Sequence, residues 1–204
     1  MSAIMAIGER RNNAELMADC HALGYLRDDD SVLDATYGLG RFWTIYRPTR
    51  LIASDLYAGG EDGIARWDFR HIPVAPRTFD VVVLDPPYKL NGTSTGKGPA
   101  ASDVDYGVGA SAPATWQERH ALIRDGITEC ARVARRVLMV KCQDQVCSGQ
   151  VRWQTREFAA HAEDQGFRLV DALHVQGHRK QPDGRRQVHA RRDYSTLLVL
   201  ERAS

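Results

Sequence analysis

The chain has 204 residues, a net charge of +1, 43% hydrophobic residues and 26% charged residues. These values are typical of a globular domain and argue against wholesale disorder, so we expect one domain over residues 1–204. Because the charges nearly cancel, binding to a polyanion would need a local concentration of positive residues. No stretch approaches the roughly 20 apolar residues of a membrane span, and residues 1–13 lack the apolar run of a signal peptide. The sequence thus predicts a soluble, cytoplasmic protein without membrane contact.

The cysteines give no indication of a metal site. Cys142 and Cys147 are five positions apart, which matches no common zinc spacing, and no histidine cluster completes a site. Cys20 and Cys130 stand alone in the sequence. We therefore predict reduced thiols and no bound metal.

Strands and helices alternate through the first half of the chain. Residues 12–23 have apolar positions at helical spacing. Residues 31–34 form a short apolar strand, and residues 51–55 form a second one; each ends in an aspartate. Residues 79–85 are rich in β-branched residues, which is typical of a central parallel strand buried on both faces.

The second half continues the alternation after a long polar segment. Residues 89–112 contain five glycines and almost no large apolar residues, which predicts a mobile loop. Further elements are expected as a helix over 114–135, a strand over 137–141, a helix over 153–165, and strands over 167–174 and 194–201. This order predicts an α/β fold with a doubly wound, mostly parallel sheet whose last strand is antiparallel.

Aspartates stand at the ends of the three clear strands. Asp34, Asp55 and Asp85 close their strands, and Asp68 lies between the second and the third. Ligands of open α/β sheets bind at the carboxyl ends of the strands. A carboxylate held there can accept hydrogen bonds from ribose hydroxyls or from amino groups. One such acid is common, but several at successive strand ends indicate a ligand site.

A glycine-containing turn follows the first strand. Gly38 and Gly40 let the backbone turn sharply and approach a ligand closely. Trp43 occupies the place of the third glycine in the dinucleotide fingerprint, so a classical NAD site is disfavoured.

The tetrapeptide Asp85–Pro86–Pro87–Tyr88 is the most informative motif of the chain. The two prolines end the strand and leave carbonyl oxygens that cannot all be paired within the sheet. The Asp85 carboxylate and the Pro86 carbonyl can then accept hydrogen bonds from one amino group, while Tyr88 offers a flat face to a planar ring. The alternative, an ordinary strand-ending turn, is less compatible with an aromatic residue in fourth place.

This tetrapeptide resembles the [DNS]-P-P-[YFW] hallmark of the S-adenosylmethionine-dependent amino-methyltransferases that make N6-methyladenine or N4-methylcytosine in DNA. The segment from Asp34 to Gly40 is similar to their cofactor loop and precedes the tetrapeptide, as in members with that motif order. The resemblance covers residues 31–90 and the remainder only by topology. It implies a Rossmann-like class I methyltransferase domain.

The resemblance also implies residue roles. The expected catalytic residues are Asp85, Pro86, Pro87 and Tyr88. Residues expected to hold S-adenosylmethionine are Asp34, Thr36, Tyr37, Gly38, Gly40, Asp55, Leu56, Asp68 and Phe69. Within this set, Asp55 would accept from the ribose hydroxyls and Asp68 would contact the adenine amino group, with Phe69 or Leu56 against the ring.

The implied function is transfer of the methyl group of S-adenosylmethionine to the amino group of a flipped-out DNA base, with adenine N6 preferred. Cytosine-N4 methylation is the close alternative, and RNA bases (adenine N6 or guanine N2) or a protein glutamine are further ones. A non-catalytic nucleic-acid-binding partner subunit is an alternative of a different class.

A basic connection, residues 175–193, links the last two expected strands. We expect phosphate contacts from positive residues here and beside the tetrapeptide, namely Lys89, Arg179, Lys180, Arg185, Arg186, Arg191 and Arg192. The alternative is a solvated hairpin. Residues 89–112 would form a lid over the flipped base. The chain has no block for a separate target-recognition domain, so a partner subunit is an open alternative.

Overall fold

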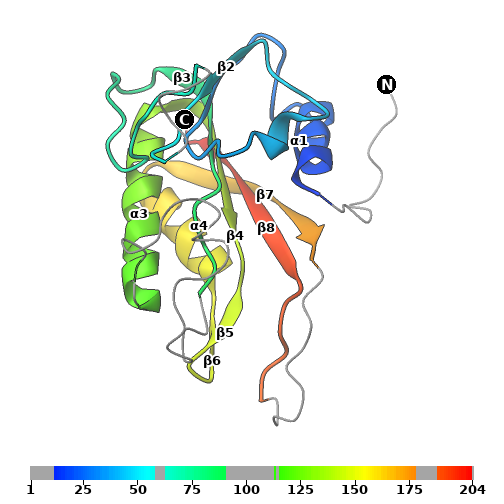
Figure 1. The fold of residues 1–204 in the computed structure, drawn as a ribbon, viewed down its shortest axis with the longest axis vertical. Helices are drawn as coiled ribbons and strands as arrows, with labels where there is room; N and C mark the ends of the chain where they lie inside the picture. The colour runs from blue at the N-terminus through cyan, green and yellow to red at the C-terminus, as the bar shows by residue number, and fades with distance from the viewer. Residues whose placement is uncertain (1–11, 58–62, 91–112, 114, 178–187, 204) are drawn as a thin grey trace.

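The structure is a computed structural model that describes residues 12–57, 63–90, 113, 115–177 and 188–203. Its centre is a six-stranded sheet in the order β2-β1-β3-β4-β8-β7, drawn in Figure 1. The strands span Ser31–Asp34 (β1), Arg50–Ala53 (β2), Phe79–Leu84 (β3), Ala134–Cys142 (β4), Phe167–Gln176 (β7) and Tyr194–Arg202 (β8). The helices are α1 (Asn13–Ala22), α3 (Trp116–Val133) and α4 (Gln154–Asp164), with the short 3-10 helix η1 (Arg41–Trp43).

The first four strands of the sheet are parallel, and the antiparallel strand is β8. Strand β1 pairs in parallel with β2 and β3, and β3 pairs in parallel with β4. Strand β8 runs antiparallel to both β4 and β7. The predicted α/β fold with a mostly parallel sheet and an antiparallel last strand is confirmed. The strand that ends the chain does not lie at the edge, because β7 takes the outer position.

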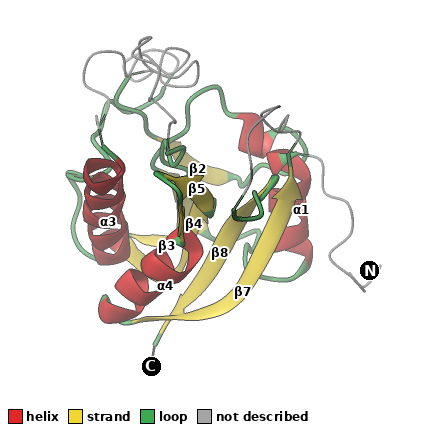
Figure 2. Cartoon of the chain, turned by 90° about the horizontal axis from the view of Figure 1, so that it is seen from below, coloured by secondary structure: helices red, strands yellow, loops and turns green. Residues whose placement is uncertain are grey.

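Helices cover both faces of the sheet, as Figure 2 shows. One face of β3 presents Val82 and Leu84 to a core that includes Ile123 of α3 and Phe158 of α4. The opposite face presents Val81 and Val83 to a second core that α1 and η1 complete. The uninterrupted apolar run of β3 follows from this arrangement, because both of its faces are buried.

Local signals in the sequence place the helix ends. The Asn12 side chain accepts a hydrogen bond from the backbone of Glu15 at 2.9 Å and caps α1. Thr115 and Glu118 form a capping box at the start of α3. Helix α3 stops at Val133 rather than at the predicted residue 135, because β4 already begins at Ala134.

A short hairpin follows β4 and was not predicted from the sequence. Strands β5 (Gln145–Cys147) and β6 (Gln150–Arg152) pair antiparallel. Ser148 (φ 51°) and Gly149 (φ 75°) form the two-residue connection, and both take the left-handed conformation that tight hairpins require. Cys147 is half-buried here, whereas Cys20, Cys130 and Cys142 are buried in the cores.

Two predicted connections fall largely outside the described residues. Of the predicted loop 89–112, residues 91–112 are not described, and of the predicted connection 175–193, residues 178–187 are not. Strand β7 extends to Gln176 and therefore includes the first two residues of the predicted connection. Strand β8 begins at Tyr194, directly after the connection ends. Within the described residues, no helix combines the length and the apolar character needed to cross a bilayer.

Candidate functional site at the carboxyl ends of the parallel strands

The carboxyl ends of β1 and β3 bring the predicted cofactor loop and the tetrapeptide together. Asp34 at the end of β1 lies opposite Val83 of β3 in the sheet register. Beyond the paired residues, the backbone N–H of Asp85 donates to Thr36 Oγ1 at 2.7 Å. Strand β1 lies between β2 and β3, so the chain moves to opposite sides of β1 here. Such a switch point is the usual ligand site of an open α/β sheet.

Asp34 is a buried carboxyl that is held in place by two donors. It is 3% exposed and accepts hydrogen bonds from Trp43 Nε1 at 2.7 Å and from the Thr36 backbone at 3.0 Å. Burial raises the pKa of Asp34 to about 7, although these two hydrogen bonds lower it, and the negative charges of Asp85 and Asp55 add to the rise. From the sequence, Trp43 was interpreted only as a departure from a glycine fingerprint; in the structure, its indole N–H orients the Asp34 carboxyl.

The turn after β1 needs its glycines. Gly38 and Gly40 both have positive φ, at 51° and 67°. A Cβ on Gly40 would lie 2.5 Å from the hydroxyl oxygen of Tyr37, so a larger residue would collide there. The Gly38 backbone donates to Asp55 Oδ2 at 3.0 Å, which connects this turn to the end of β2. The expected loop is therefore a tight turn between two strand-end aspartates.

Asp55 uses both carboxylate oxygens to organise the backbone around it. Its Oδ1 accepts from the Tyr57 backbone at 2.8 Å, and its Oδ2 accepts from Gly38. The neighbouring Leu56 side chain is 38% exposed. Leu56 therefore has apolar surface available to a ligand, as its predicted role requires.

Asp68 and Phe69 are engaged within the protein. Burial raises the pKa of Asp68, but hydrogen bonds from Arg70 outweigh this effect and hold the pKa below its ordinary value. Arg70 Nε lies 2.9 Å from Asp68 Oδ1, and Arg70 Nη2 lies 2.5 Å from Asp68 Oδ2. The Phe69 ring packs against Gly126 of α3, where a Cβ would come within 2.5 Å of it. Contact between Asp68 and an adenine amino group stays a prediction, and it would require Asp68 to share or exchange its Arg70 partner.

Asp85 is the least satisfied group of the site. The residue is partly accessible, but its Oδ1 atom is buried and has no hydrogen-bond partner within the described part of the chain. Burial raises the pKa of Asp85, and the positive charges of Lys141 and Lys89 act in the opposite direction. The Pro86 carbonyl, predicted as a second acceptor for substrate, accepts the Tyr88 backbone at 2.6 Å and keeps one lone pair free of that bond.

The backbone carbonyl groups of Pro87 and Tyr88 accept hydrogen bonds from side chains that were not singled out from the sequence. The Tyr88 carbonyl accepts from Gln145 Nε2 at 2.9 Å and from Gln154 Nε2 at 2.8 Å. Arg119 of α3 donates to the Pro87 carbonyl at 2.9 Å. Gln145 is 3% exposed and Gln154 is fully buried. The sequence around both glutamines is polar and gave no signal of their burial, although buried amides need fixed partners.

Lys141 is a second residue that the sequence analysis left without a role. It stands near the carboxyl end of β4 and is 1% exposed. Its Nζ atom donates to Asn13 Oδ1 of α1 at 2.5 Å and lies 5.5 Å from the centre of the Phe42 ring. A buried lysine at this end of the sheet is uncommon, because an ammonium group is costly to remove from water.

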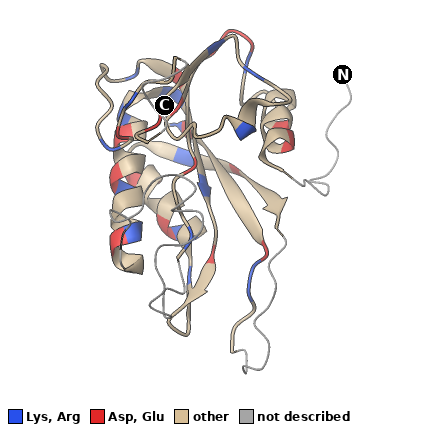
Figure 3. Cartoon of the chain, viewed as in Figure 1, with Lys and Arg blue, Asp and Glu red and all other residues tan. Residues whose placement is uncertain are grey.

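The predicted phosphate-binding residues are only partly described. Lys89 is exposed directly after the tetrapeptide, and Arg191 is exposed before β8. The guanidinium of Arg192 lies 4.4 Å from the centre of the Trp153 ring. Figure 3 shows basic residues on the extended segment that leads into β8. The remaining candidates, Arg179, Lys180, Arg185 and Arg186, lie outside the described residues.

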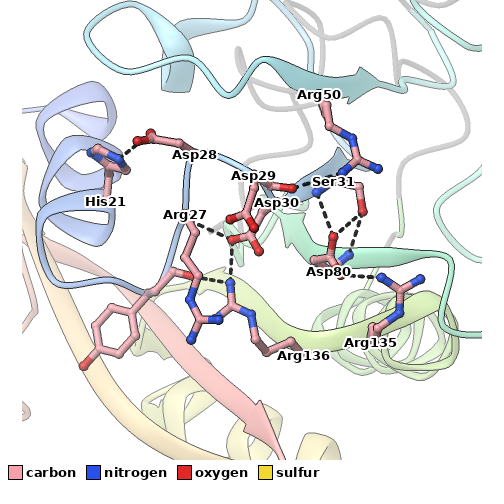
Figure 4. A network of polar contacts seen from close by, with 11 residues as sticks. His21, Arg27, Asp28, Asp29, Asp30, Ser31, Arg50, Asp80, Arg135 and Arg136 are labelled. Atoms are coloured by element: carbon pink, nitrogen blue, oxygen red, sulfur yellow. Dashed lines mark hydrogen bonds and ion pairs between the residues drawn. The ribbon is translucent and has the colours of Figure 1, made fainter.

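Charged residues at the amino ends of the same strands are paired, as Figure 4 shows. Asp80 forms an ion pair with Arg135 and accepts from Ser31 Oγ at 2.7 Å and from the Ser31 backbone at 2.9 Å. Asp30 accepts from Arg136 at 2.5 Å. These contacts hold the starts of β1, β3 and β4 together on the side of the sheet away from the tetrapeptide.

Comparison with known proteins gives the fold. No family model matches the sequence, and no curated protein matches it. A candidate methyltransferase from Bacillus halodurans C-125 superposes with a TM-score of 0.58 at 11% identity, covering 94% of this chain and 99% of that chain. A candidate RNA methyltransferase from Pyrococcus horikoshii gives 0.57 at 12% identity, covering 94% and 83%. Magnesium protoporphyrin IX methyltransferase from Synechocystis PCC 6803, solved with S-adenosylhomocysteine (SAH), gives 0.52 at 14% identity, covering 94% and 80%.

One matched structure is considerably longer than this chain. The chain spans about half (51%) of a candidate DNA modification methylase from Thermus thermophilus, at 13% identity and a TM-score of 0.44. A similarity of this size carries no argument about function. The superpositions above 0.5 agree with the observed strand order and directions. This chain therefore has the Rossmann-like fold of S-adenosylmethionine-dependent methyltransferases.

Proposed function

We propose that this chain is an S-adenosylmethionine-dependent methyltransferase that methylates the exocyclic amino group of a nucleic-acid base, with adenine N6 of DNA as the first candidate. The observation that carries the proposal is the buried Oδ1 atom of Asp85, which has no hydrogen-bond partner among the described residues. A buried acceptor without a donor costs free energy, and ligand binding can supply the donor. An amino group beside Pro86 and Tyr88 would do so.

The residues near Asp34 fit the proposed cofactor. Gly38 and Gly40 carry no side chains and take positive φ, so the chain turns tightly between the ends of β1 and β2, beside Asp34 and Asp55. Asp34 and Asp55 place carboxylates at neighbouring strand ends, where hydroxyl and amino groups of a ligand can donate to them. S-adenosylmethionine supplies an activated methyl group on a positively charged sulfur. The carboxylates at this end of the sheet favour binding of a positive charge.

Asp85 and Pro86 would prepare the amino group for reaction. The lone pair of an exocyclic amine is delocalised into the ring, which makes the nitrogen a poor nucleophile. By accepting hydrogen bonds from its two N–H groups, Asp85 and the Pro86 carbonyl favour a pyramidal nitrogen whose lone pair points at the methyl carbon. As the N–C bond forms, the electron pair of the broken C–S bond stays on sulfur. The nitrogen then loses one proton, which Asp85 can accept and pass to water.

Tyr88 would hold the base by stacking. The hydrogen bonds from Gln145 and Gln154 fix its carbonyl and therefore the backbone that carries the ring. A base inside a duplex is inaccessible to such a site, so a duplex substrate would have to flip its target out, at a cost of a few kcal/mol.

The nucleic-acid class is supported by the basic residues of the connection before β8 and by Lys89 next to the tetrapeptide. Cytosine N4 of DNA would fit the same acceptors. An RNA base is the second candidate, favoured by the similarity to the fold of the candidate RNA methyltransferase from Pyrococcus horikoshii.

The test is transfer of a labelled methyl group from S-adenosylmethionine to duplex DNA, single-stranded DNA and total RNA, followed by mass analysis of the nucleosides. We expect N6-methyladenine in DNA from the wild-type protein and no product from Asp85→Ala. Label in RNA alone would move the protein to the second candidate. If S-adenosylmethionine binds but no nucleic acid is labelled, the proposed catalytic activity is wrong for the isolated chain, and a non-catalytic partner role replaces it.

A further inference from the structure

Lys141 and Asp85 lie beside each other on adjacent strands. The parallel register of β3 and β4 pairs Val83 with Met139 and Leu84 with Val140. The next step of this register places Asp85 next to Lys141. Val83 and Met139 face the core that α1 and η1 cover, and successive side chains of a strand alternate between faces. The side chains of Asp85 and Lys141 therefore leave the sheet on the same face.

The Lys141 side chain and the Oδ1 atom of Asp85 are buried, and neither has a partner of opposite charge at contact distance among the described residues. Asp85 Oδ1 has no hydrogen-bond partner, and no carboxylate within the described residues forms an ion pair with Lys141. Lys141 Nζ has three N–H donors, one of which is directed to Asn13. Burial lowers the pKa of Lys141 and raises that of Asp85. Each charge opposes this effect on the other group, since the positive Lys141 lowers the pKa of Asp85 and the negative Asp85 raises that of Lys141.

The other groups around Asp85 would not keep it ionised by themselves. Asp34 and Asp55 contribute negative charge at the neighbouring strand ends, and Asp34 and Asp85 interact unfavourably when both are charged. Lys89 is positive but exposed, so solvent screens it. Among the groups that contact Lys141 from other elements, Asn13 of α1 and Phe42 of η1 carry no charge. Its neighbour on the same strand, Cys142, is a buried thiol.

We propose that Lys141 is a positioning residue for the proposed methyl transfer: its buried ammonium on β4 keeps Asp85 a charged hydrogen-bond acceptor. This inference rests on the proposed function and adds a residue that the tetrapeptide does not contain. A protonated Asp85 would present an O–H donor with less capacity to accept from the amino group. A single buried cation next to Asp85 acts against both the burial of the carboxylate and the negative charge of the nearby Asp34.

The first experiment measures the ionisation of Asp85 directly and needs no substrate. Protein labelled with ¹³C at the aspartate carboxyl carbon is titrated by NMR, and the Asp85 signal is identified by its absence in Asp85→Ala. In Lys141→Met, which keeps an unbranched side chain one atom shorter but removes its charge, we expect the Asp85 titration midpoint to move upward by about one pH unit or more. Lys141→Arg retains the positive charge and should keep the midpoint near that of the wild type. An unchanged midpoint in Lys141→Met would overturn the inference.

The second experiment follows methyl transfer with pH. In Lys141→Met, kcat at pH 7 should fall by up to about 10-fold for each pH unit that the Asp85 midpoint moves upward, with a much smaller change in KM for the nucleic acid, because the acceptor and not the binding surface is altered. The acidic limb of the kcat profile should move to higher pH together with the NMR midpoint, and Lys141→Arg should restore most of the activity. Equal losses in Lys141→Arg and Lys141→Met, with no movement of the limb, would indicate a merely structural role and refute the proposal.

The two experiments separate this inference from the proposed function. If the Asp85 midpoint moves in Lys141→Met but the wild-type protein methylates no nucleic acid, the charge coupling stands and the proposed function fails. If the wild-type protein methylates DNA and Lys141→Met retains the wild-type rate and pH profile, the proposed function stands and the role of Lys141 fails.

Discussion

The two ends of the parallel strands use aspartate in opposite ways. At the amino ends, Asp80 is paired with Arg135 and bonded to Ser31; burial opposes its ionisation, but these contacts prevail and hold its pKa below the ordinary value. At the carboxyl ends, burial raises the pKa of Asp34 to about 7 and also raises that of Asp85. Strand β1 contributes residues to both environments, since Ser31 begins it and Asp34 ends it.

The aspartates at the amino ends of the strands therefore stabilise the fold, whereas those at the carboxyl ends are available for function. A paired carboxylate stabilises the folded state. A buried carboxyl oxygen that accepts no hydrogen bond lowers the stability of the fold, but it remains able to accept one from a ligand. The amino ends of β1, β3 and β4 are thereby fixed by the protein alone. At the carboxyl ends, a bound ligand would supply the hydrogen-bond donors that the protein itself does not provide.

The largest effect is expected from Asp85→Ala. Removing the acceptor should lower methyl transfer by at least about 10³-fold, because the interaction is used in the transition state. Binding of S-adenosylmethionine, followed by calorimetry, should stay within a few-fold of the wild type. Asp80→Ala is the matched control at the other end of the sheet and should retain its activity. If Asp85→Ala also abolished cofactor binding, the assignment of roles within the site would be wrong.

The next prediction concerns the pH dependence of stability through Asp34. Its pKa is raised from an ordinary 3.8 to about 7 in the folded protein, so the folded state holds a proton that the unfolded state releases. The resulting stabilisation is present at low pH and is lost as the pH rises through about 4 to 7, by roughly 4 kcal/mol. Asp34→Asn resembles the protonated form at every pH. Its free energy of unfolding should therefore exceed that of the wild type by more at pH 8 than at pH 4.5.

Urea unfolding at the two pH values measures this difference. Other carboxylates contribute the opposite slope, since Asp80 has a lowered pKa and its stabilisation is lost as the pH falls. The comparison is therefore made between Asp34→Asn and the wild type at each pH. An equal difference at both values would mean that Asp34 does not titrate abnormally.

A smaller effect is expected from Asp80→Ala on stability. Loss of the Arg135 pair and of two hydrogen bonds from Ser31 should reduce the free energy of unfolding by about 1–2 kcal/mol, since the pair itself is partly exposed. Asp85→Ala should cost less than this, because it removes a carboxyl whose ionisation burial opposes and whose Oδ1 atom has no hydrogen-bond partner among the described residues. Chemical denaturation of both variants at pH 7 tests the ranking, and a larger loss in Asp85→Ala would reverse the comparison between the two ends.

The smallest effect is expected from the basic connection. Arg185→Ala together with Arg186→Ala should weaken nucleic-acid binding about 10-fold and reduce the slope of log affinity against log salt by about two. Arg135→Ala is the control, because Arg135 is engaged with Asp80 at the opposite end of the sheet. Fluorescence anisotropy with labelled DNA at several salt concentrations gives both quantities. An unchanged slope in the double variant would remove the case for phosphate contacts there.

Much of this arrangement could be predicted from the sequence, because it is encoded locally. The apolar run that ends at Asp85 predicted a buried central strand, and the turn after Asp34 was recognisable from its glycines. The hairpin after β4 was missed because its strands have three residues each, although Ser148–Gly149 is a turn-forming dipeptide.

The supporting residues were not predictable in the same way. Arg119, Gln145 and Gln154 acquire their roles only when α3, β5 and α4 meet under the tetrapeptide. The positions of these residues in the sequence carry no periodic signal for that contact. Lys141 is the last residue of the strand predicted over 137–141, where polar residues are common, and only the register with β3 places it beside Asp85.

The hairpin of β5 and β6 also provides a chemical handle. Cys147 is half-buried, whereas the other three cysteines of the chain are buried, and burial raises the pKa of the Cys130 and Cys142 thiols. A thiol-reactive fluorophore should therefore attach to Cys147 in preference to the others. Gln145, two residues away on the same strand, donates to the Tyr88 carbonyl. A fluorophore on Cys147 would thus report on the tetrapeptide, because Cys147 lies on the same short strand as the Gln145 that contacts Tyr88. No engineered cysteine is needed for this label.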